Sequence, residues 1–169
     1  TLNTVEFPRT QPPSGEPVVI SSKELKDALA QVVLAASKDA QKHNLSAVLL
    51  ASTDKGIRLV ATDGYRLAMR DIVGTSAASP DSFLIPAPAL VELLRLLDMS
   101  EEITIRFNDL DATFQSPTMT LSTRLINAEY PPYQTIIPKN NTNTATVNRE
   151  ELLDALRRTR VLASEMAPV

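Results

Sequence analysis

The stretch that decides the fold reads Ala61-Thr62-Asp63-Gly64-Tyr65-Arg66-Leu67-Ala68. Residues 57–62, in front of the Asp-Gly pair, alternate in polarity, and residues 65–72 behind it form a second strand-like run. An Asp-Gly pair between two such runs favours a two-residue hairpin loop, because a type I′ turn needs positive φ at both central positions. The stretch therefore predicts a β-hairpin with strands at 57–62 and 65–72.

Further strands are expected on both sides of this hairpin. Residues 45–51 form a continuous apolar run of strand length, and Asp54-Lys55-Gly56 connects that run to the hairpin. A small, polar loop is expected at 73–81. Beyond it, strand patterns lie at 83–85, at 103–107, around Phe114, around Met119 and Leu121, at 134–137, and in a short segment before Arg149.

Three helices are expected as well. Ser21 and Glu24 form a capping-box pattern, and apolar residues at helical spacing follow, which predicts a helix at 22–37. A second helix begins near Pro88, where the missing N–H is harmless, and a third begins at Arg149. Two helices and roughly eight strands within one unit predict an α+β domain.

The composition limits what this domain can be. The 169 residues allow one domain with a proper core plus extra chain at the ends, and 43% hydrophobic with 22% charged residues is ordinary for a soluble protein. Trp is absent and aromatic residues are scarce, so we expect an aliphatic core. The lack of Cys excludes disulfides and thiolate chemistry and fits a cytoplasmic protein. No apolar run approaches the roughly 18 residues that span a membrane.

Nothing in the sequence indicates catalysis. His43 is the only histidine and has no nucleophile motif near it, and four glycines leave no phosphate-binding loop. Asp109 and Asp111 are better explained by a turn between strands than by a metal site. An enzyme using the Asp63 carboxylate is the weakest alternative, because no partner base is present. We therefore expect no catalytic residue, no metal and no cofactor.

An internal repeat suggests tandem domains. Residues 21–29 and 148–156 align without gaps, and both carry the pattern Glu-Leu-x-Asp-Ala-Leu. Glu6-Phe7-Pro8 before the first helix resembles Glu129-Tyr130-Pro131 before the last. Capped amphipathic helices share a small alphabet, which is the alternative explanation, but repeated units leave this kind of self-similarity. We expect the end of one domain and a linker at 1–17, a complete domain at 18–138, and a linker with a truncated domain at 139–169.

The basic residues of the first two helices and the following loop allow two interpretations. The net charge of −3 argues against a generic basic nucleic-acid binder. The residues are either an ordinary solvated face or a surface that neutralises phosphates without reading sequence. The candidates for such a surface are Lys23, Lys26, Lys38, Lys42, His43 and Arg95.

Three motifs in one order carry a family resemblance. They are the stretch 61–68, the strand end 85–86 leading into residues 90–95, and Glu129-Tyr130-Pro131-Pro132-Tyr133 continuing to Pro138. Together they resemble the bacterial DNA polymerase III β subunit, the sliding clamp. The resemblance covers essentially the whole chain, from the end of the first clamp domain through the middle domain to the start of the third.

The resemblance implies a non-catalytic processivity factor. In that family two three-domain subunits close head to tail into a ring, with helices lining the hole and sheets outside. The ring holds polymerase to duplex DNA by topology, so sequence-independent contacts from the basic residues above suffice. The expected partners are duplex DNA, a second subunit in the full-length homodimer, polymerases, the clamp loader and repair proteins. The alternative is a freestanding peptide-binding adaptor of clamp fold that does not encircle DNA.

The resemblance also implies a peptide-binding cleft between the middle and third domains. Leu45, Leu67 and Ile136 would form the apolar pocket, into which a partner motif inserts Leu or Phe. Tyr65 stands where the family often has His, and Thr135 where some members have Arg, which puts a charge contact at the rim in doubt. The middle-domain wall, carried over by position, comprises Leu45, Thr62, Gly64, Tyr65, Arg66, Leu67, Pro131, Thr135 and Ile136.

Overall fold

The computed structural model describes residues 13–39, 41–74, 82–98 and 102–161. Most of the loop expected at 73–81 lies outside the described residues, as does Glu6-Phe7-Pro8. The chain divides into two compact units, Thr1–Pro131 and Pro132–Val169, and each is described by itself.

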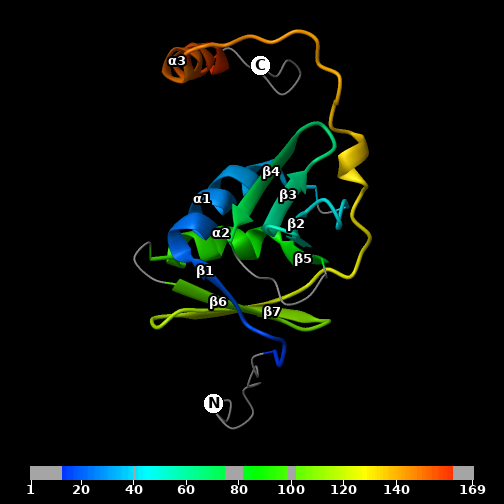
Figure 1. The fold of residues 1–169 in the computed structure, drawn as a ribbon, viewed down its shortest axis with the longest axis vertical. Coiled ribbons are helices and arrows are strands. Elements are labelled where there is room, and N and C mark those ends of the chain that lie inside the picture. The colour runs from blue at the N-terminus through cyan, green and yellow to red at the C-terminus, as the bar shows by residue number, and fades with distance from the viewer. Residues whose placement is uncertain (1–12, 40, 75–81, 99–101, 162–169) are drawn as a thin grey trace. The chain divides into compact units, whose positions relative to one another are not determined.

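The first unit contains two four-stranded antiparallel sheets and two α-helices in its described part (Figure 1). The hairpin sheet has the order β4-β3-β2-β5, and the second sheet has the order β1-β6-β7-β8. These eight strands confirm the α+β expectation. The hairpin sheet comprises β2 Ala47–Thr53, β3 Gly56–Thr62, β4 Leu67–Val73 and β5 Ser82–Pro86. The second sheet comprises β1 Val18–Ser21, β6 Glu102–Phe107, β7 Asp111–Gln115 and β8 Thr120–Arg124.

The two helices begin where the sequence predicts. Helix α1 spans Ser22–Val32 and continues into a 3₁₀ turn, η2, at Val33–Ala35. Helix α2 spans Ala87–Leu96 with Pro88 in its first turn. The predicted capping box of α1 is wrong: Ser21 makes no side-chain cap hydrogen bond. Ser21 is also the last residue of β1, paired with Glu102, so strand pairing sets its position.

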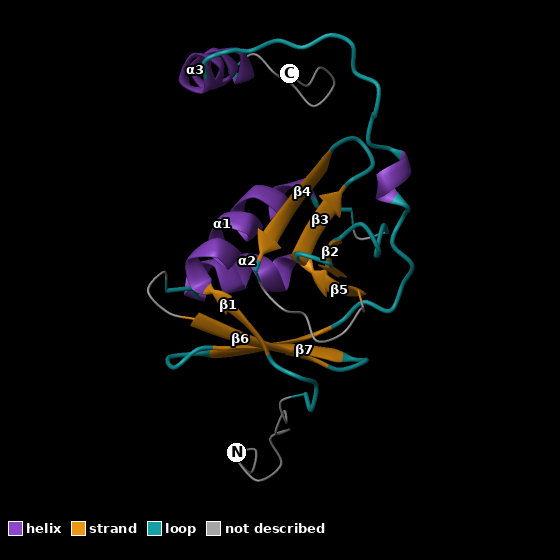
Figure 2. Cartoon of the chain, viewed as in Figure 1, coloured by secondary structure: helices purple, strands orange, loops and turns teal. Residues whose placement is uncertain are grey.

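Both sheets and both helices share one aliphatic core. Figure 2 shows the helices and strands that contribute to it. Leu25 and Leu29 of α1 are almost fully buried, as are Leu90 of α2 and Ile105 of β6. The largest fully buried side chain is Phe114 of β7. Truncating a buried leucine such as Leu29 to alanine would cost about 2–5 kcal/mol, since it leaves a cavity at the junction of these elements.

A chain segment at 125–131 runs beside the edge strand β5 and reaches β3 of the hairpin sheet through Tyr130. Leu49, Val60 and Leu84 are cross-strand neighbours in this sheet and are buried, yet they lie outside the main core cluster. The Ile126 N donates to the Leu84 carbonyl (2.9 Å), and the Tyr130 hydroxyl lies 3.4 Å from the Val60 carbonyl oxygen, to which it donates. The segment therefore ends, at Pro131, on the sheet that carries the hairpin.

The second unit corrects two strand predictions. The segment predicted as a strand at 134–137 begins instead with a 3₁₀ turn, η3, at Tyr133–Thr135, closed by a hydrogen bond from Thr135 N to the Pro132 carbonyl (3.1 Å). No strand precedes Arg149 either, because residues 141–148 have no regular structure. The apolar pattern was misleading in the first case: Pro132 lacks an amide for a strand ladder, and its carbonyl starts a turn.

The third predicted helix is present as α3, Arg149–Arg160. The Asn148 side chain caps it, accepting from Glu150 N (2.8 Å) and Glu151 N (3.3 Å). Within the residues that the structure describes, none of the helices is long and apolar enough to cross a membrane.

Candidate functional site

The hairpin loop is longer than predicted. β3 ends at Thr62 and β4 begins at Leu67, and these two residues are the last pair of the ladder. Four residues, 63–66, therefore form the loop, and only Gly64 among them has positive φ (95°). The two-residue type I′ turn and a return strand beginning at Tyr65 are both wrong, because side-chain hydrogen bonds organise this loop in place of a tight backbone turn.

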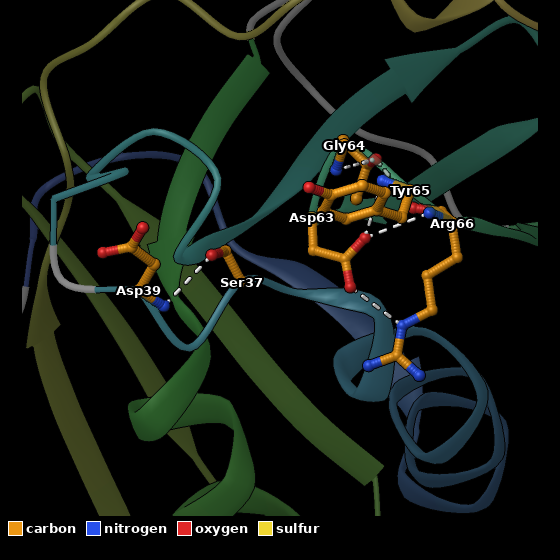
Figure 3. Close-up of polar contacts among 7 residues, drawn as sticks. Ser37, Asp39, Asp63, Gly64, Tyr65 and Arg66 are labelled. Atoms are coloured by element: carbon orange, nitrogen blue, oxygen red, sulfur yellow. Dashed lines mark hydrogen bonds and ion pairs between the residues drawn. The ribbon is translucent and has the colours of Figure 1, made fainter. Parts of the chain in front are cut away.

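Asp63 is the centre of that hydrogen-bonding arrangement (Figure 3). Its Oδ1 accepts from Tyr65 N and from Arg66 N, both at 3.0 Å, and its Oδ2 accepts from Arg66 Nε, also at 3.0 Å. This is an Asx-type turn, in which a short acidic side chain substitutes for backbone acceptors. One carboxylate thereby satisfies two loop amides and one guanidinium N–H.

Thr62 completes the loop from the strand side. Its Oγ1 donates to the Arg66 carbonyl (2.7 Å) and accepts from Gly64 N (3.1 Å). Thr62 is itself buried. Together the two side chains give the amides of residues 64, 65 and 66 a partner each, so the loop is held in one conformation before any ligand arrives.

The carboxyl group of Asp63 is acidified by this arrangement. Burial alone would raise the pKa of Asp63, but the backbone hydrogen bonds from Arg66 and Tyr65 and the charged Arg66 side chain outweigh it. The net result is a pKa below the usual value. Asp63 is therefore ionised at neutral pH and acts as a hydrogen-bond acceptor rather than as a proton donor.

The loop presents an exposed aromatic ring. Tyr65 is 94% exposed, and the Lys42 Nζ lies 5.8 Å from the centre of its ring, within cation–π range. Two residues further along the chain, Leu67 is half-buried on β4. Tyr65 and Leu67 thus offer an aromatic and an aliphatic side chain two positions apart, which is a suitable base for an apolar side chain of a partner.

The rest of the first-unit wall is tied to the same sheet. Leu45 is half-buried, and its carbonyl accepts from Ser37 N (2.8 Å). The neighbouring Asn44 Nδ2 donates to the Glu129 carbonyl (3.1 Å), which links this loop to the segment that ends at Pro131. Hydrogen bonds thus connect the elements that carry Leu45 and Pro131, while Lys42 links the first of them to the hairpin loop.

Two predicted wall residues belong to the second unit. Thr135 lies in η3, and Ile136 follows it and is 63% exposed. Because the two units are described separately, the closed pocket of Leu45, Leu67 and Ile136 stays a prediction.

The six predicted DNA-facing residues have different surroundings. Lys23 is exposed on α1. The Lys26 Nζ donates to the Leu97 carbonyl just after α2 (2.8 Å), so this lysine links α1 to the end of α2. Arg95 is exposed and paired with Glu92 (2.9 Å). The other three residues lie in the loop after η2, where all are exposed: Lys38, Lys42 and His43.

Sequence reasoning missed the roles of Asp63 and Lys42. Asp63 stands between predicted wall residues and was treated only as part of a turn, whereas it positions two of them. The available signal was an aspartate inside a turn, because an Asp side chain commonly accepts hydrogen bonds from the backbone N–H groups two and three residues later. Lys42 lies over the Tyr65 ring, which the sequence does not predict, and its contact with DNA stays a prediction. Among the described residues, no cluster of three metal-binding side chains occurs.

Comparison with known families identifies the fold. Residues 19–132 match the family model described as "DNA polymerase III beta subunit, central domain". This chain belongs to that family. The match begins in β1 and ends one residue after Pro131, so it covers both sheets, α1, α2 and the whole hairpin loop of the beta-subunit domain.

Known relatives and solved structures agree with this assignment. The chain is 32% identical over 165 residues to the beta sliding clamp of Synechococcus elongatus and 29% identical over 147 residues to that of Buchnera aphidicola subsp. Acyrthosiphon pisum. These alignments cover 95% and 86% of this chain but 44% and 40% of the relatives. The crystal structure of the Bacillus subtilis DNA polymerase sliding clamp superposes with a TM-score of 0.89 at 27% identity, covering 97% of this chain and 44% of that one. The chain thus spans less than half the length of each.

Proposed function

We propose that this chain is part of a sliding clamp, a non-catalytic ring that encircles duplex DNA and keeps a replicative polymerase on its template in the cytoplasm. The observation that carries the proposal is the family match over residues 19–132. Relatives called beta sliding clamp, aligned over most of this chain, support it. In this arrangement residues 18–138 are the middle domain, and 1–17 and 139–169 belong to its neighbours.

The hairpin loop then serves as one wall of a docking site for peptide tails. Its support is physical: the loop is preorganised by Asp63 and Thr62, it exposes Tyr65, and it leads into the half-buried Leu67. A preorganised apolar surface lowers the entropy cost of binding a flexible tail. Polymerases, a clamp loader and repair proteins with a short motif containing Leu or Phe are the proposed occupants.

The contact with DNA is proposed to be weak and independent of sequence. Lys23 and Arg95 are exposed on the two helices, and Arg95 shares its charge with Glu92. A ring held on DNA by topology needs only such mobile phosphate contacts, because dissociation requires opening of the ring or sliding off an end.

The test uses the full-length protein loaded on nicked circular DNA. Retention on the circle followed by loss after the DNA is linearised is the expected result for a topological clamp. Equal retention on circular and linear DNA would instead favour the adaptor that binds peptides without encircling DNA. The control is the same DNA linearised with a protein bound at each of its two ends. A clamp should stay on this blocked linear DNA because it cannot slide off.

A further inference from the structure

The outer face of the second sheet carries an open groove whose arginine is incompletely bonded. Along β6 the core residues Ile103 and Ile105 alternate with Glu102, Thr104 and Arg106, which therefore point to the other face. A groove of about 530 Å³ lies on this face. Its lining comprises Glu102, Thr104 and Arg106 of β6 and Gln115, Ser116 and Pro117 at the end of β7.

Arg106 is the feature that points to a ligand. Its Nη1 is buried and has no hydrogen-bond partner among the described residues, and its side chain forms no ion pair with them. Buried polar groups nearly always have a partner, and a guanidinium prefers a carboxylate or phosphate that it can bind with two parallel N–H groups. The buried Nη1 is not itself open to the groove, but Arg106 lines the groove with other atoms, so its positive charge can attract an oxyanion bound there.

The far wall of the groove is held rigidly. Ser116 Oγ accepts from Thr118 N (3.3 Å) and Met119 N (3.2 Å), which fixes the turn between β7 and β8 and with it Pro117. Thr104 and Gln115 are cross-strand partners, so their side chains lie opposite each other in the middle of the groove. The groove thus offers a hydroxyl and an amide between its two charged residues.

The second charged residue decides which class of anion fits. Glu102 and Arg106 stand four residues apart on one strand, about 13 Å at the usual rise. A nucleic acid carries a negative charge at every nucleotide and would meet Glu102 as well as Arg106. An extended peptide with an acidic and a basic side chain four positions apart has the same repeat as β6 and matches both charges.

We propose that the groove over β6 and the turn after β7 binds an extended, mixed-charge peptide segment of a partner protein. The peptide carboxylate meets Arg106, its basic side chain meets Glu102, and the residue between them, two positions from each, contacts Thr104 and Gln115. β6 is an inner strand, paired with β1 and β7, so the peptide lies across the sheet face through its side chains and adds no strand. The groove is on the other sheet from the hairpin loop, so this site is separate from the docking wall of the proposed clamp.

The test is an NMR titration of the chain with a capped five-residue peptide that has glutamate first, lysine last and small residues between. Saturable shifts at the Arg106 side-chain N–H and at Thr104 are the expected result. Arg106→Gln and Glu102→Gln should each weaken binding about tenfold, the effect of one charge-assisted hydrogen bond. The matched control Arg124→Gln changes an exposed arginine of β8 outside the groove and should leave the affinity unchanged.

Four results would overturn the proposal. One is the absence of saturable shifts. Another is equal binding of a peptide with glutamine in place of glutamate. The third is tighter binding of a short oligonucleotide than of the peptide, which would assign the groove to phosphates. Thermal unfolding of Arg106→Gln is measured in parallel, because a purely structural role would lower the melting temperature without any peptide dependence, and that result with unchanged peptide affinity also rejects the site.

Discussion

Arg66 donates two hydrogen bonds to Asp63, from its backbone N to Oδ1 and from Nε to Oδ2, and both are 3.0 Å long. Only two residues separate the partners, so this contact closes the hairpin loop on itself. It fixes the backbone that carries Tyr65 and leads directly into Leu67. The docking wall therefore depends on a carboxylate that would not itself touch a partner.

Asp63→Asn should make hairpin stability less dependent on pH. The folded-state pKa of Asp63 is lowered, so its contribution is present above the unfolded value near 3.8 and is lost as pH falls through the folded pKa. Unfolding in urea should show the variant less stable by about 1 kcal/mol at pH 7, with the difference shrinking at pH 3. A gap of equal size at both pH values would contradict the acidified carboxylate. The pKa of Asp71 is also lowered, by its pair with Arg58 (2.7 Å), so Asp71→Asn should show the same kind of pH dependence at a position outside the loop.

Leu67→Lys should abolish docking of a tail peptide in the full-length protein. Leu67 is half-buried beside the exposed Tyr65, and a charge there would have to be desolvated when an apolar side chain binds. We expect at least a tenfold loss, roughly the effect of a hot-spot residue, by fluorescence anisotropy with a labelled peptide containing Leu and Phe. Met69→Lys is the matched control, because Met69 lies two residues further on the same face of β4 and is 42% exposed. Unchanged affinity in Leu67→Lys would remove the hairpin loop from the docking site.

Lys26→Met and Lys23→Met should separate a structural lysine from a surface lysine. Lys26 Nζ donates to the carbonyl of Leu97, the residue that follows the last residue of α2, and a positive charge at this end of a helix also favours the helix dipole. Its replacement should lower the free energy of unfolding by about 1 kcal/mol. Lys23 is exposed, so its replacement should leave stability unchanged and reduce DNA retention slightly at low salt. The assignment fails if both variants unfold at the same temperature as the parent.

Asn148→Ala and Ser21→Ala should differ although the two residues align in the internal repeat. The Asn148 side chain accepts two hydrogen bonds at the start of α3, whereas the Ser21 side chain caps nothing. Loss of a side-chain cap costs about 1 kcal/mol. Hydrogen exchange should therefore speed up in the first turn of α3 in Asn148→Ala, with no matching change in α1 of Ser21→Ala. Equal effects at the two helices would mean that the cap geometry is wrong.

Local patterns in the sequence located both helices and seven of the eight described strands of the first unit, but β1, Val18–Ser21, was not predicted. Periodicity and length predicted the hairpin strands, β5 and α2. Each of these polarity patterns reflects which side chains of a single strand or helix are buried, so neighbouring residues are enough to recognise it. The same rule failed at 134–137, where an apolar run next to proline forms η3. It also failed for the hairpin loop, because Asp63 and Thr62 accept backbone hydrogen bonds that a type I′ turn does not need.

The candidate site was predicted in part. The stretch 61–68 carries the family motif, so the sequence alone predicts Thr62, Tyr65 and Leu67 as wall residues. The contacts that support these residues could not be predicted from the sequence. Lys42 lies over the ring of Tyr65, and Asn44 donates a hydrogen bond to the Glu129 carbonyl, and in both cases many residues separate the partners along the chain. Sequence spacing does not reveal which distant groups fold next to each other.

By itself the sequence determined the α+β class, the aliphatic core and the position of the hairpin, since these depend on short-range polarity patterns and on turn chemistry. The tertiary structure decided how the charged side chains are used. It joined Lys26 to Leu97 across 71 positions, placed Ile126 beside β5 of the hairpin sheet, and left the Nη1 of Arg106 without a partner among the described residues. The physical reason is that a charge acquires its role from its solvation and its partners, and both exist only after distant parts of the chain have packed together.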